Sequence, residues 1–94
     1  MEIEILLQGR GYMLRPTFEA LCIVEERLDT GIVALVRKLA QGTIRLKELA
    51  IIIDSCLENN DEAAFMEESL ADGGLLQAIQ AVSAMMAAVL EPST

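Results

Sequence analysis

Two cysteines, Cys22 and Cys56, are the side chains of this sequence that come nearest to reactive groups. A cysteine or serine nucleophile needs a base beside it, and because the chain has no histidine that base would be Lys38, Lys47 or a carboxylate. None of these residues forms a recognisable motif with a nucleophile. Both cysteines fall on predicted apolar helical faces, where a thiol packs as a small hydrophobic group. We therefore predict two reduced, buried thiols and no enzymatic activity.

Ligand-binding motifs are equally sparse. Gly9 and Gly11 have the spacing that opens a dinucleotide-binding loop, but position 14 is Leu and the segment joins two predicted strands. The acidic residues between positions 54 and 62 lack the alternating oxygen ligands and the glycine of a calcium loop. The cysteines lie 34 positions apart, which matches no zinc spacing. The sequence predicts no cofactor and no metal.

Charge and length narrow the function classes further. The 94 residues carry a net charge of −8, which is unsuited to contacting phosphates, so nucleic acid is not expected as a ligand. All seven basic residues lie within residues 1–47, whereas residues 48–94 hold nine acidic residues and no basic one. The acidic start is unlike an export signal, and Leu75–Leu90 is shorter than the roughly 20 residues of a membrane span. We expect a cytoplasmic protein that does not associate with membranes.

The elements that must position these residues begin with a β-hairpin. Residues 2–8 start with alternating polar and apolar side chains, and an extended pattern resumes over residues 12–15. Gly9 and Gly11 suit the positive φ angles of a short connection between the strands. Pro16 has no N–H to donate and is expected to end the second strand.

Helical spacing of apolar residues continues through the rest of the chain. The predicted helices are residues 18–28, 32–41 and 46–57, a fourth that follows a turn at residues 59–61 and runs to about Asp72, and a last one over residues 75–90. Thr17 and Thr30 are the expected N-caps of the first two helices. On the first helix, one side is expected to carry Phe18, Leu21, Cys22, Glu25 and Leu28. Consecutive isoleucines at 51–53 widen the apolar face of the third helix, which predicts a central place for it.

These elements predict an α+β fold that is mainly α, in a single domain over residues 1–94. The domain consists of an N-terminal two-stranded β-hairpin, residues 1–15, and a bundle of four to five helices, residues 17–90.

Two surfaces of this fold are suited to contacts with other proteins. A two-stranded hairpin exposes backbone edges that must dock on the helices or be extended by another chain. The last helix carries alanines and Met85 beside its apolar stripe, so it is either enclosed in its own bundle or covered by a partner or a second copy. The candidate partner-binding residues are Tyr12, Met13, Arg15, Ala81, Met85 and Ala88.

The order of several motifs resembles a known family. The matching segments are Gln8–Arg15, Thr17, Leu21–Glu25, Gly31, Leu39–Gly42 and Leu49–Leu57. Together, over about residues 5–90, they resemble the short tail protein of alphaproteobacterial gene transfer agents, which are phage-like particles. Two features depart from that pattern: Pro16 at the junction of strand and helix, and Leu57–Asn60 in place of a glycine-rich stretch.

The resemblance implies a non-enzymatic part of a phage-like tail, either a tail tube protein or a tail assembly chaperone. Its partners would be other tail proteins, such as the tape-measure or tail tube protein, with a homo-oligomer as a further option. It would be cytoplasmic or incorporated in a phage-like particle.

The residues leave open an alternative from another class, an acidic regulatory module that occupies a basic groove of a DNA-binding partner. That module would use Glu58, Asp61, Glu62, Glu67, Glu68 and Asp72.

Overall fold

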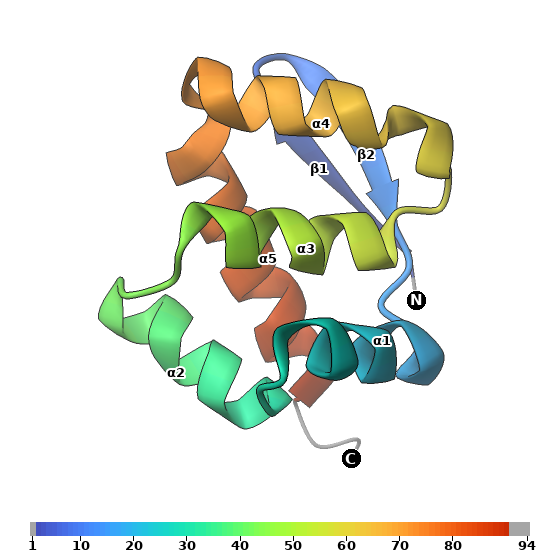
Figure 1. Ribbon diagram of the computed structural model, residues 1–94. Helices are drawn as coiled ribbons and strands as arrows, with labels where there is room; N and C mark the ends of the chain where they lie inside the picture. Colours follow the sequence, from blue (N-terminus) through green and yellow to red (C-terminus); the bar gives the residue numbers. More distant parts are fainter. Residues whose placement is uncertain (1, 91–94) are drawn as a thin grey trace.

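The computed structural model describes residues 2–90 and shows an N-terminal hairpin packed against helices (Figure 1). The strands are β1 (Ile3–Leu7) and β2 (Arg10–Leu14). The helices are α1 (Phe18–Leu28), α2 (Ile32–Gln41), α3 (Leu46–Cys56), α4 (Ala63–Ser69) and α5 (Leu75–Leu90). A 3-10 turn (Asn60–Glu62) precedes α4, and a π-helical turn (Leu70–Gly74) joins α4 to α5. The predicted α+β, mainly α fold class is confirmed.

The hairpin closes two residues earlier than the glycines predict. Its turn consists of Gln8 and Gly9, both at positive φ (53° and 81°), and β2 already begins at Arg10. Two consecutive left-handed residues form the tight turn whose twist matches that of the two strands. The connection predicted over residues 9–11 is therefore wrong in its position, although the hairpin and the end of β2 before Pro16 are confirmed.

The outer edge of β2 is closed by the chain that leaves α3. The N–H of Arg15 donates to the C=O of Cys56 (2.7 Å), and the N–H of Glu58 donates to the C=O of Met13 (3.0 Å). Leu14 and Leu57 form an antiparallel bridge between these two bonds. One edge of the hairpin is thus satisfied inside the chain, as a marginal two-stranded sheet requires.

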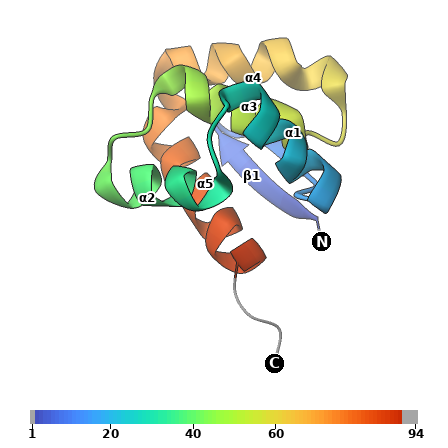
Figure 2. The ribbon, with the colours of Figure 1, turned by 60° about the horizontal axis from the view of Figure 1, so that its bottom comes forward.

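Helix α3 occupies the centre of the bundle, as its widened apolar face predicts. It contacts α1, α4 and α5, and in Figure 1 it lies between α4 and the pair α1 and α2. Its fully buried residues are Leu49, Ile52, Ile53 and Cys56. Figure 2 shows the C-terminal end of α5 at the margin of the molecule.

Helix α1 buries a different face from the predicted one. Ala20 and Val24 are its buried residues, whereas Phe18 is 85% exposed and Cys22 is exposed. Relative to the predicted face, the buried face of α1 is rotated by about a quarter turn. The reason is that α1 packs on α3 through the small residue Ala20, which permits close approach of the two helices. The prediction followed the largest side chains and was wrong for Phe18 and Cys22.

Capping of the helices follows the prediction in part. The hydroxyl of Thr17 accepts from the N–H of Ala20 (3.1 Å) and caps α1, as predicted. Gly31, not Thr30, is the N-cap residue of α2, and a carboxylate oxygen of Glu25 accepts from the N–H of Ile32 (2.9 Å). The predicted cap Thr30 instead donates to the C=O of Leu28.

The junction of α4 and α5 depends on two glycines. Gly73 has φ 113°, a conformation that L side chains rarely adopt, and it turns the chain between the two helices. A side chain at Gly74 would lie 2.8 Å from the backbone C=O of Ser69. The predicted break at these two positions is confirmed, although α4 itself ends at Ser69 and the π-helical turn completes the segment.

We predict that Gly73→Ala lowers the free energy of unfolding by about 1–3 kcal/mol, because the β-carbon is strained at this φ. Urea denaturation followed by circular dichroism measures the change. Gly11→Ala is the matched control, since Gly11 is not at positive φ and its added carbon meets only the flexible carboxylate of Glu4. Equal stability of Gly73→Ala and the wild type would contradict the strained junction.

Candidate protein-interaction surfaces

The hairpin candidates lie in three different environments. Tyr12 is completely buried, and its hydroxyl forms a hydrogen bond with the hydroxyl of Ser69 (3.0 Å). Met13 is half-buried and its C=O is used by Glu58, while Arg15 is exposed and pairs with Glu2 and Glu58. Tyr12 is therefore not part of the exposed surface, because it fills the core between the hairpin and α4. This corrects its assignment as a partner contact.

The candidates on α5 are likewise divided. Met85 is 1% exposed and belongs to the buried stripe of α5, together with Ala78, Val82 and Met86. Ala81 is half-buried and Ala88 is exposed. Met85 is therefore corrected from a partner contact to a core residue, because the helix turns its flexible side chain toward the other elements.

The outward side of α5 has no charged residue from Leu75 to Leu90. Its exposed residues, which we call the α5 face, are Leu75, Leu76, Gln77, Gln80, Ala84, Ala87, Ala88 and Leu90. Leu76 is 66% exposed, the largest fraction on this helix among the bulky apolar residues. In a chain with a net charge of −8, an outward surface this long without charge is unusual for a helix face that meets only water.

The same apolarity meets the length and composition criteria for a membrane span over the helical path Asn60–Leu90. The most apolar window of that path has a mean hydropathy of 1.6 and is 28% buried. The path is broken by the turn at Gly73, and α5 alone has 16 residues, a length of about 24 Å against the roughly 30 Å of a bilayer core. Its exposed apolar face is thus better matched to a protein surface.

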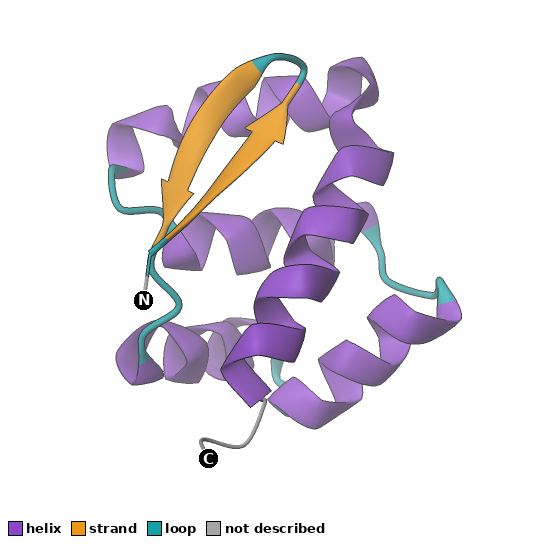
Figure 3. Ribbon diagram, turned by 180° about the vertical axis from the view of Figure 1, so that it is seen from behind, coloured by secondary structure: helices purple, strands orange, loops and turns teal. Residues whose placement is uncertain are grey.

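The outer edge of β1 lies beside α5. The register pairs Ile5 with Tyr12 and Leu7 with Arg10, so the backbone groups of Glu4 and Leu6 point away from β2. The Leu6 side chain is 58% exposed, and β1 and α5 are in contact, as Figure 3 shows from behind. The β1 edge and the α5 face therefore form two adjacent parts of one side of the molecule.

Sequence reasoning missed Leu6 and Leu76. Both belong to leucine pairs: in Leu6–Leu7 the second residue is buried and the first faces outward, and in Leu75–Leu76 the second is the more exposed, at 66% against 38%. Two consecutive leucines in a strand must point to opposite faces, which was the available signal for Leu6. In the helix the signal was weaker, because adjacent positions are separated by only about 100°.

The acidic residues of the alternative hypothesis are not all free. Glu58 pairs with Arg15 (3.6 Å) and Glu62 lies 3.9 Å from Arg10. Within residues 2–90, the remaining four make no ion pair and are exposed: Asp61, Glu67, Glu68 and Asp72.

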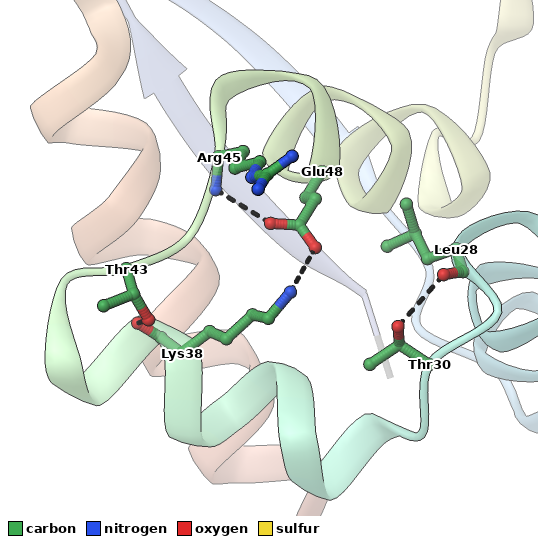
Figure 4. A network of polar contacts seen from close by, with 6 residues as sticks. All are labelled: Leu28, Thr30, Lys38, Thr43, Arg45 and Glu48. Atoms are coloured by element: carbon green, nitrogen blue, oxygen red, sulfur yellow. Dashed lines mark hydrogen bonds and ion pairs between the residues drawn. The ribbon is translucent and has the colours of Figure 1, made fainter.

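A partly buried carboxylate, that of Glu48, joins α2 to the start of α3 (Figure 4). One oxygen of Glu48 accepts from the Lys38 ammonium (2.7 Å), and the other accepts from the backbone N–H of Arg45 (3.0 Å). The hydrogen bond from Lys38, followed by that from Arg45, lowers the pKa of Glu48 below its usual value. These two hydrogen bonds to Glu48 fix the loop between α2 and α3.

The two thiols differ in environment. Cys56 is buried, and desolvation raises its pKa to about 11, so the thiol stays protonated at neutral pH. Cys22 is exposed on α1, which contradicts the prediction that both thiols are buried.

Among residues 2–90, no group of three or more Cys, Asp or Glu side chains is placed to hold a metal ion.

Comparison with known proteins places the chain in a class. A family model described as phage tail tube protein, GTA-gp10, matches residues 1–91, so the chain is a structural protein of a phage-like tail. It belongs to this GTA-gp10 family, which confirms the resemblance to gene transfer agent tail proteins. Neither a curated protein nor a solved structure matches the chain.

We expect the thiols to react in two separate steps. In native buffer an aromatic disulfide reagent titrates one thiol per chain, Cys22, because Cys56 is inaccessible and protonated. In urea it titrates both. In the Cys22→Ser variant no thiol is expected to react in native buffer and one is expected to react in urea, which checks the assignment. Two thiols that react equally fast in the native state would contradict it.

The Glu48 network predicts a loss of stability in acid. Because the folded-state pKa of Glu48 lies below its unfolded value, its stabilisation is fully present above the unfolded value and is lost as the pH falls through the folded one. Glu48→Gln is therefore expected to lower the free energy of unfolding by about 1 kcal/mol at neutral pH. The difference from the wild type disappears once both are measured in strong acid.

Urea denaturation at several pH values measures this difference. Glu26→Gln on the exposed side of α1 is the control, because it removes a carboxylate that makes no ion pair among the described residues. A constant difference between Glu48→Gln and the wild type at every pH would exclude the proposed role of the Glu48 charge.

Proposed function

We propose that this chain is a non-enzymatic tail assembly chaperone or adaptor, which binds another tail protein through the α5 face and the adjacent β1 edge. The observation that carries the proposal is the uncharged outward side of α5 in a strongly acidic chain. The coarser role, a structural protein of a phage-like tail, follows from membership in the family.

The size of the sheet favours a chaperone or adaptor over a subunit that lines a tube. A subunit that lines a ring needs strands long enough to pair with its neighbours, and here the sheet has two strands of five residues each. Its β2 edge is already occupied by Cys56–Glu58. Among residues 2–90, the β1 edge, flanked by α5, is the edge that remains to extend the sheet.

The partner best suited to this side is an apolar helix or extended segment of the tape-measure or tail tube protein. Such a segment buries Leu6 and Leu76 and packs closely against Ala84 and Ala88, since small side chains permit short distances between backbones. The absence of charge on α5 removes the desolvation cost that a buried Lys or Glu would add. Binding of this kind depends little on salt.

The reactive groups of the chain support a role without catalysis. The buried thiol is protonated, and the exposed Cys22 has no histidine anywhere in the chain to act as its base. Contact with other tail proteins, rather than conversion of a small molecule, is the role that we assign to this chain.

We predict that Ala84→Glu or Ala88→Glu weakens binding to the tape-measure or tail tube protein at least about tenfold, because each places a charge in an apolar contact. Isothermal titration calorimetry with each purified partner measures the affinity. Ala34→Glu on α2 is the control, since it adds the same charge at an exposed alanine outside the α5 face.

Circular dichroism confirms that the variants remain folded. Retention of full affinity in both α5 variants would exclude this face as the binding site. No association of the wild type with either partner at micromolar concentration would exclude the proposed function itself.

A further inference from the structure

Three cavities run together along the outward side of α3. The largest, about 480 Å³, lies among α1, α2 and α3, and two smaller ones of about 200 and 220 Å³ continue it toward α4. Lys47 lines all three cavities, and Ala50 lines the two nearer α4. We call this continuous depression the α3 groove.

The rim of the α3 groove gathers most of the positive charge of the chain. Four of the seven basic residues line it: Arg27, Lys38, Arg45 and Lys47. Arg27 and Lys38 are paired within the chain, with Asp54 and Glu48. Within the described part of the chain Arg45 and Lys47 make no ion pair, and the one unpaired carboxylate that lines the groove is Glu67, near α4, so an excess of positive charge remains for a carboxylate from outside.

The floor of the groove is apolar. Leu46, Ala50 and Ile51 contribute to it, and Leu46 is 48% exposed although its helix is central to the bundle. A groove with an apolar floor and a cationic rim fits an amphipathic helix that carries carboxylates beside a large apolar side chain.

The chain itself carries such a helix surface. Asp61, Phe65, Glu68 and Asp72 follow one another at helical spacing through α4 and its flanking turns, and we call them the α4 stripe. The three carboxylates are exposed and unpaired within residues 2–90, and Phe65 is 49% exposed. Its ring is covered on one face by the Arg10 guanidinium, 4.3 Å from the centroid.

The α4 stripe cannot reach the groove of its own chain. Glu67 faces the groove from α4, whereas Phe65, Glu68 and Asp72 line a separate cavity with Arg10 and Tyr12 on the hairpin side. The two complementary surfaces thus lie on opposite flanks of α4 and can meet only between molecules.

We propose that the α3 groove binds the α4 stripe of a second copy of this chain. Arg45 and Lys47 pair with Glu68 and Asp72 of the second copy, and Phe65 of that copy covers the exposed Leu46. Because the two surfaces differ, the contact is head to tail and each copy keeps one free groove and one free stripe, so longer assemblies form. The contact does not involve the α5 face, so its failure leaves the proposed function untouched.

The opposing term is the net charge of −8, which makes two copies repel each other at long range. At about 0.15 M salt this repulsion is screened beyond roughly 8 Å, while charges in direct contact are screened less. The contact is therefore expected near physiological salt, with apolar burial of Phe65 and Leu46 supporting the ion pairs.

Sedimentation velocity of the full chain over a range of concentrations tests the proposal. The wild type is expected to form dimers and longer species. Lys47→Glu, which blocks the groove, and Glu68→Lys, which blocks the stripe, are each expected to weaken self-association at least about tenfold. An equal mixture of the two variants is expected to associate more strongly than either variant alone, because the intact stripe of one meets the intact groove of the other and the two reversed charges can also pair.

Two control variants change the net charge by the same amounts at exposed sites outside both surfaces, Arg37→Glu for the groove and Glu26→Lys for the stripe. Both are expected to associate as the wild type does. A wild type that stays monomeric at every concentration and salt would overturn the proposal. So would a mixture of Lys47→Glu and Glu68→Lys that remains monomeric, or binding of an oligonucleotide at the groove in place of the second copy.

Discussion

The backbone hydrogen bonds between β2 and the end of α3 hold this molecule together. A hairpin of two five-residue strands is marginal alone, and it becomes part of the fold because Met13 and Arg15 bond to the chain at Cys56 and Glu58. This contact fixes the side of the sheet that faces the helices, so Tyr12 and Leu14 are fully buried. It also leaves β1, on the other side, as the outer edge.

The position of β1 then determines where α5 lies. The N–H of Gln8 donates to the side-chain oxygen of Gln77 (2.9 Å), and the left-handed Gly73 directs α5 along β1. The helix buries Val82 and Met86 and turns Leu76 outward. An exposed apolar face next to an open strand edge is therefore a consequence of how the hairpin docks.

Charge is distributed over three sides of the fold with different properties. The α5 face has none, the α4 stripe is acidic, and the α3 groove gathers cations around an apolar floor. The even mixture of charges that keeps a monomer soluble is absent from the α5 face and the α4 stripe, whereas the α3 groove holds both signs with an excess of cations. Such separation suits a protein with more than one neighbour, because each side selects a partner of different chemistry.

The sequence by itself determined the elements and most of their ends. Alternation indicated the hairpin, Thr17 the start of α1, and the paired glycines at 73–74 the break before α5. These features depend on backbone preferences and on hydrogen bonds between residues near one another in the chain, which local sequence encodes. The central place of α3 was also predictable, because three consecutive isoleucines need burial on more than one side.

Only the tertiary structure decided which side of each element is buried. Phe18 and Cys22 are exposed while Ala20 packs inside, and Tyr12 and Met85 fill the core although their positions suggested contact with partners. Helical spacing specifies an apolar face only to within about a quarter turn. Which side is buried then depends on the neighbouring helix, because the two helices pack on the sides that allow the shortest distance between them. The α3 groove arises in the same way, because Arg27, Lys38 and Lys47 are distant in sequence and meet only where α1, α2 and α3 pack together.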